Sequence, residues 1–147
     1  MTVPRFIEMW IIKTIILLTL LLYASVMDIK TREVPNPVSG MLLILGLVDK
    51  DIDQLPSMII GALLVFLPQF VSALINPSKA LGGADIKISS SAAFLLGTPN
   101  GLFTLIVGLT LSVVTMPILR KVRKLPTDQP FPLIPFLSVG IVAGYFI

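Results

Sequence analysis

The sequence predicts an all-α membrane protein, a bundle of about six transmembrane helices built from residues 1–147 as a single domain. More than half of the residues are apolar (55%), only 13% are charged, and the mean hydropathy is +0.98. Soluble domains carry about 25% charged residues, and a chain this short has too much surface to hide so much apolar area from water. Lipid is therefore the expected solvent.

Six apolar segments account for this composition. A full crossing takes about 20 apolar residues, a length that the first, third and fifth segments reach and the other three do not. The sequence leaves open whether the short segments cross fully. In the last segment, Gly140 and Gly144 have the spacing that lets helices approach closely. In chain order the segments are 6–27, 37–48, 55–75, 86–97, 102–119 and 133–147.

The basic residues gather in alternate connections between these segments. With six crossings, loops 28–36, 76–85 and 120–132 lie on one side of the membrane. That side holds eight of the 11 basic residues, so the positive-inside rule makes it the cytoplasmic side of a cell membrane, with both termini outside. The same placement argues against nucleic-acid binding, despite a net charge of +3. The eight residues are Lys30, Arg32, Lys79, Lys87, Arg120, Lys121, Arg123 and Lys124.

The absence of cysteine and histidine from the sequence limits its chemistry. Disulfides, thiolate or imidazole metal sites, cysteine nucleophiles and Ser-His triads are excluded. No cofactor and no metal are expected. Any catalysis then depends on carboxylates, hydroxyls, amines or the backbone.

Two aspartates stand at the edges of apolar segments. Asp28 ends the first segment, and Asp85 follows Gly82, Gly83 and Ala84 just before the fourth. Because the chain crosses twice between them, both are expected at the same membrane face. Carboxylates within about 3 Å share one proton, so one can act on water as a base and the other as an acid. As alternatives, Asp85 caps a helix and Asp28 marks the membrane edge. The two glycines before Asp85 allow close backbone approach or a positive φ.

The residues around both aspartates resemble the type IV prepilin peptidase family. Segment 28–36 reads Asp-Ile-Lys-Thr-Arg-Glu-Val-Pro-Asn, similar to a first motif in which a basic stretch and Pro-Asn or Pro-Asp follow the aspartate. Segment 82–87 reads Gly-Gly-Ala-Asp-Ile-Lys and resembles the second motif, Gly-x-Gly-Asp, an apolar residue and Lys, with Ala84 in place of the second glycine. Segment 132–136, Pro-Leu-Ile-Pro-Phe, is similar to the family's last span.

This resemblance implies a membrane aspartic endopeptidase with Asp28 and Asp85 as its catalytic residues. Its substrates would be prepilin-like subunits (type IV pilins, archaellins or pseudopilins) that lose a short basic leader, a class III signal peptide, at the cytoplasmic face. Larger bacterial members add a cysteine-containing domain and methylate the new N-terminus. Because this chain has no cysteine and no room for that domain, peptidase activity without methyltransferase activity is expected. The supporting loop is Gly82, Gly83, Ala84 and Lys87.

Two other functions stay open. A presenilin-like intramembrane protease places its first aspartate in a Tyr-Asp pair within a helix, whereas Met27 precedes Asp28 here and Asp28 is expected to open a polar loop. A small transporter or scaffold would suit helices broken at Pro68 and Pro117. Transporters, however, keep carboxylates deep in their spans, and only Glu8 is a candidate for such a position. The oligomeric state and the substrate-binding residues are not predicted.

Overall fold

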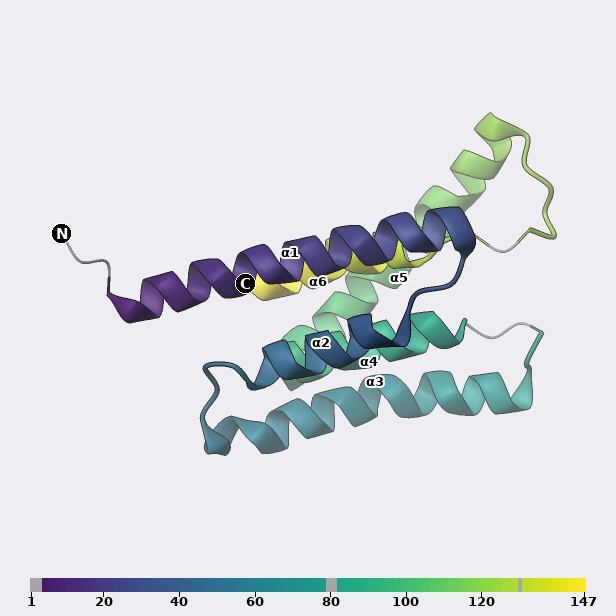
Figure 1. Ribbon diagram of the computed structural model, residues 1–147. Helices are drawn as coiled ribbons and strands as arrows, with labels where there is room; N and C mark the ends of the chain where they lie inside the picture. Colours follow the sequence, from purple (N-terminus) through teal and green to yellow (C-terminus); the bar gives the residue numbers. More distant parts are fainter. Residues whose placement is uncertain (1–3, 79–81, 130) are drawn as a thin grey trace.

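The computed structural model describes residues 4–78, 82–129 and 131–147, which form six α-helices and one short 3-10 helix (Figure 1). No strand occurs among these residues. The predicted all-α helix bundle is therefore confirmed. The elements are α1 (Arg5–Thr31), α2 (Asn36–Leu47), η1 (Ile52–Gln54), α3 (Leu55–Ile75), α4 (Gly83–Leu96), α5 (Thr98–Arg123) and α6 (Ile134–Phe146).

Length divides the helices into two sets. Three stretches are long and apolar enough to cross a membrane, namely α1, the continuous η1 and α3, and α5. This confirms the full length expected for the first, third and fifth segments. By contrast, α2, α4 and α6 have 12, 14 and 13 residues, about 18–21 Å of helix at 1.5 Å per residue.

The six helices alternate in direction, so three helix ends and three helix starts meet at one end of the bundle (Figure 1). The end of α1 lies there together with the starts of α2, α4 and α6, while both chain termini lie toward the opposite end. Helix α4 contacts α2, α3, α5 and α6, and α6 packs on α5 and α1. Along their described residues α1 and α4 do not pack directly against each other.

The bundle has an apolar outside and several polar groups inside. Large apolar side chains on the long helices point outward, as at Ile15, Leu64 and Val113. Lipid is as apolar as a protein core, so these side chains gain little by being buried. The buried polar residues are Lys13, Asp28, Gln69, Ser89, Ser91, Thr104, Ser112 and Ser138. This distribution is that of a membrane protein.

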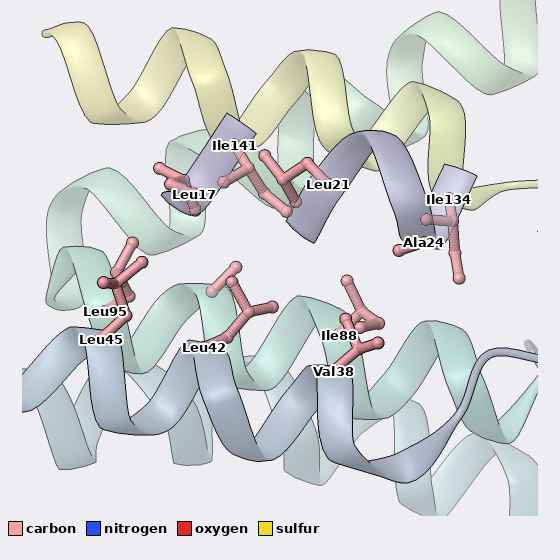
Figure 2. Close-up of a cluster of buried hydrophobic side chains, with 11 residues drawn as sticks. Leu17, Leu21, Ala24, Val38, Leu42, Leu45, Ile88, Leu95, Ile134 and Ile141 are labelled. Atoms are coloured by element: carbon pink, nitrogen blue, oxygen red, sulfur yellow. The ribbon is translucent and has the colours of Figure 1, made fainter. Parts of the chain in front are cut away.

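An apolar cluster joins the α1–α6 pair to the α2–α4 pair (Figure 2). The side chains from α1 and α6 point toward those from α2 and α4, and α1 reaches α4 through this cluster. Its members are Leu17, Leu21, Ala24, Val38, Leu42, Leu45, Ile88, Ala92, Leu95, Ile134 and Ile141.

Several helices extend further than their apolar segments predicted. Helix α1 continues to Thr31, α4 begins at Gly83, and α5 continues to Arg123. The expectation that Asp28 opens a loop was therefore wrong. Polar residues at a span end keep the helical hydrogen bonds even after the apolar run stops, and cations are favourable at a helix C-terminus. Thus Arg120, Lys121 and Arg123 lie in the last turn of α5, whereas Lys79 lies outside the described residues.

Candidate active site

Asp28 lies on the inward face of α1, at the start of its last turn. The buried positions before it are Leu17, Leu21 and Ala24, and this spacing of four, three and four residues follows one helix face. Arg32 adopts a left-handed conformation and ends the helix, donating its N–H to the Asp28 carbonyl oxygen at 3.1 Å. The helical face that packs the core therefore also carries this carboxylate inward, where it is only 6% exposed.

The start of α6 holds the Asp28 carboxylate. The backbone N–H of Ile134, the first residue of α6, donates to Asp28 Oδ2 at 3.0 Å. The first N–H groups of a helix have no partner within the helix, and they carry the positive end of its dipole. This contact therefore satisfies an N–H of α6 that has no partner within its own helix.

Asp85 lies in the first turn of α4, at its third residue. The helix cap is Gly82, with no side-chain capping bond, so the alternative in which Asp85 caps the helix was wrong. Gly83 and Ala84 precede the apolar segment but are already helical, so the helix begins earlier than that segment. The Asp85 side chain is therefore half-buried at the bundle end where α1 finishes.

The residues before Asp85 fit their positions for different reasons. A Cβ added to Gly82 would lie 3.1 Å from Asp85 Oδ2, so glycine gives the carboxylate room there. A Cβ at Gly83 would meet nothing within 4 Å. Ala84 is helical and needs no left-handed conformation, which explains why alanine can replace the glycine of the motif. The close-approach expectation applies to Gly82 alone, and neither glycine has a positive φ.

The charge of Asp28 affects the protonation of Asp85. Asp85 lies just before the apolar segment 86–97. Burial raises its pKa to about 7, and the charge of Asp28 is the second cause of this rise. A backbone hydrogen bond from Gly82 acts weakly in the opposite direction. A carboxyl with such a pKa is partly protonated near neutral pH, so the pair can hold one proton between two groups.

A groove lies beside the pair. It has a volume of about 600 Å³ and runs between the α1–α2 connection (residues 32–35) and the first turns of α4. Met27 and Ala84, the residues that immediately precede Asp28 and Asp85, both line it. Its remaining walls are mostly polar, and they are formed by Thr31, Arg32, Glu33, Val34, Pro35, Asn36, Gly83 and Lys87.

Lys87 lines this groove from the α4 side. Its Nζ donates to Asn36 Oδ1 at 2.8 Å, which links α4 to the first residue of α2. The Lys87 ammonium therefore has a protein partner. Asn36 does start the second helix, as its position before Pro37 predicts.

The profile of the type IV leader peptidase family matches residues 15–117. The chain belongs to this family. The matched region includes both aspartates, the groove and five of the six helices in whole or in part. The resemblance drawn from the two aspartate motifs is thus confirmed.

One relative of the leader peptidase family extends the match to more of the chain. The "Prepilin leader peptidase/N-methyltransferase" of Pectobacterium carotovorum subsp. carotovorum is 32% identical over 140 residues, 88% of this chain. The chain spans about half (49%) of that relative's length. No solved structure matches the chain with significance.

Two contacts at the site were not predicted from the sequence. Ile134, which donates to Asp28, lies beyond the part matched by the leader peptidase profile. Pro135 marks the start of a helix there, but nothing in the sequence connects that start to Asp28. The pairing of Asn36 with Lys87 likewise depends on the register of two helices, although both residues lie in the recognised motifs.

Proposed function

We propose that this chain is an aspartic endopeptidase that removes the leader from prepilin-like subunits. The observation that supports this most is the placement of two carboxylates at one end of the bundle, close enough for the charge of Asp28 to raise the pKa of Asp85, near an open groove. Family membership supports the peptidase activity, and the printed name of the Pectobacterium relative supports the substrate class. Both aspartates lie in the matched region.

In the proposed reaction, Asp28 is the base and Asp85 is the acid. Asp28 Oδ2 accepts the Ile134 N–H, and burial favours the protonated form of Asp85. Asp28 takes a proton from water as the water oxygen bonds to the scissile carbonyl carbon, and Asp85 donates its proton to the carbonyl oxygen. The C–N bond then breaks, the proton on Asp28 passes to the leaving amine, and the hydroxyl proton returns to Asp85. The products are one carboxylic acid and one amine.

We propose that this site faces the cytoplasm. The bundle end that carries both aspartates also carries Lys30, Arg32 and Lys87, and the last turn of α5 adds three more basic residues. Such a concentration of Lys and Arg in short connections is typical of the cytoplasmic side. The termini lie toward the opposite end and would face outward.

Cleavage of a prepilin-like substrate in inverted membrane vesicles tests the proposal. Asp28→Asn and Asp85→Asn keep the side-chain shape, but an amide can neither take up the proton as Asp28 does nor donate it as Asp85 does, so each should lower the rate by at least about 100-fold. Asp51→Asn is the matched control, because Asp51 is exposed in the α2–α3 connection. Sealed right-side-out vesicles should not cut added substrate. Retained cutting by both aspartate variants would refute the two-carboxylate mechanism.

The proposal covers the peptidase step alone. The name of the relative also includes an N-methyltransferase, but this chain spans only 49% of that protein, so the second activity is not carried over. The mass of the cleaved product reports methylation in the same assay, and we expect an unmethylated N-terminus.

The transporter alternative is weaker than the peptidase. Helices α3 and α5 continue through Pro68 and Pro117 without a break, and Glu8 lies exposed in the first turn of α1. The placement of Asp28 within a helix agrees with the presenilin-like alternative. Nevertheless, Asp28 lies three residues before the end of α1, which favours cutting at the membrane edge.

A further inference from the structure

Helices α2 and α4 run parallel in a constant register from the site end of the bundle. Figure 2 shows Val38 beside Ile88 and Leu45 beside Leu95, so the same offset holds along the seam. Near its far end, a Cβ on Gly46 would lie only 3.0 Å from the Leu95 backbone. The hydrogen bond between Asn36 and Lys87 continues this seam to the site end.

The Asn36–Lys87 bond holds the segment that forms one wall of the groove. Within the α1–α2 connection, the bonds are local, such as the 3.0 Å bond from Thr31 Oγ1 to the Glu33 carbonyl oxygen. Among the described residues, the bond from Lys87 is the one hydrogen bond that ties residues 32–36 to α4. Without it, the wall would be held only by its two chain ends and by apolar packing of Val34.

The groove itself suits an extended polar peptide. Its volume of about 600 Å³ lies within the range of ligand sites, and its lining offers hydroxyl, carboxylate and backbone groups that can bind a peptide. Met27 and Ala84, which line the groove, are the chain neighbours of Asp28 and Asp85, although neither aspartate lines the groove itself.

We propose that this groove holds an extended, polar segment of the substrate to one side of the cleavage site, and that the Asn36–Lys87 bond fixes the groove wall for binding. This inference rests on the proposed peptidase function. Asn36 and Lys87 are then positioning residues, since they act through the wall rather than on the reacting atoms. Loss of their bond should weaken substrate binding more than it slows the chemical step.

Steady-state cleavage kinetics in proteoliposomes test this inference. Asn36→Ala and Lys87→Met should each raise KM about three- to tenfold and leave kcat within about twofold. The double variant should be no worse than the worse single variant, because both remove the same bond. Exchanging the partners, Asn36→Lys with Lys87→Asn, should restore KM. Lys121→Met, which removes an exposed lysine from the last turn of α5, is the matched control and should leave KM unchanged.

Photo-crosslinking gives a second readout that does not depend on these variants folding. A benzophenone amino acid at Thr31, in the groove, should capture the substrate, whereas the same probe at exposed Val122 should not. Unchanged KM in both single variants, a failed exchange, or no capture at Thr31 would overturn the inference. If Asp28→Asn and Asp85→Asn are inactive in the same assay, the proposed function stands without it. If those variants still cut, the proposed function fails first.

Discussion

Asp28 and Lys13 both lie on α1, and each forms a hydrogen bond with the backbone at the end of a different neighbouring helix. The carboxylate of Asp28 accepts from the first N–H of α6, and Lys13 Nζ donates to the Val48 carbonyl oxygen at the end of α2, at 2.9 Å. A helix N-terminus favours negative charge and a C-terminus favours positive charge. These two charged residues of α1, both buried, are therefore placed where the backbone of a neighbouring helix stabilises them.

The pKa of Asp85 predicts how activity depends on pH. Its pKa is raised to about 7 by burial and by the charge of Asp28. The proposed acid donates only while it is protonated, so kcat/KM should fall as the pH rises through about 7. A pH series with the wild-type enzyme measures this.

An infrared titration of the carboxyl bands gives the control. In Asp28→Asn the neighbouring charge is gone, so Asp85 should titrate at a lower pH than in the wild type. A kcat/KM that is flat between pH 5 and 9 would contradict the assignment of Asp85 as the acid.

At the residue level, the sequence predicted that Asp28 and Asp85 lie at the same end of the bundle but not what holds them there. Counting two crossings between Asp28 and Asp85 was enough to place both at one end of the bundle. The Ile134 contact and the Asn36 contact depend on the rotation and register of packed helices, which no local pattern encodes. Both are contacts between residues at least 50 positions apart in the chain.

Helices α5 and α6 pack through glycine. A Cβ at Gly140 would overlap the Thr104 carbonyl oxygen and lie 3.0 Å from the Gly108 nitrogen, and a Cβ at Gly144 would overlap the Thr104 hydroxyl. The spacing of Gly140 and Gly144 predicted a close approach, and this is confirmed on α6. The partner helix was not predicted. Because α6 also supplies the N–H that holds Asp28, this packing sets the position of the site.

Gly140→Ala should destabilise the protein by about 1–3 kcal/mol, because the atoms that its Cβ meets are backbone and cannot move aside. Gly40→Ala is the matched control. Gly40 lies inside α2 with nothing within 4 Å of an added Cβ, so alanine there should be neutral or slightly stabilising. Thermal unfolding in detergent compares the two. Equal stability of the two variants would argue against close α5–α6 packing in the membrane.

Across the whole molecule, the apolar segments predicted the number and order of helices but not their ends. Segment 55–75 matches α3 at both ends, whereas segment 102–119 falls four residues short of each end of α5. Hydropathy reports where lipid begins and not where the helical hydrogen bonds stop. The lateral order, with α2 and α6 between α1 and α4, could not be predicted, because apolar helices give little indication of which face meets which neighbour.

The two charged contacts of α1 mark two levels across the bundle. Lys13 and Asp28 are 15 residues apart, about 22 Å along a helix, and the short helices α2 and α6 end or begin at these levels. The hydrocarbon core of a typical bilayer is about 30 Å thick. We therefore expect the membrane beside the short helices to be thinner than this, which would bring headgroups and water toward the carboxylates. Lipid chain length then becomes a determinant of hydrolysis. We expect faster cleavage in dimyristoyl than in dierucoyl phosphatidylcholine vesicles, and equal rates would show that no such thinning accompanies the reaction.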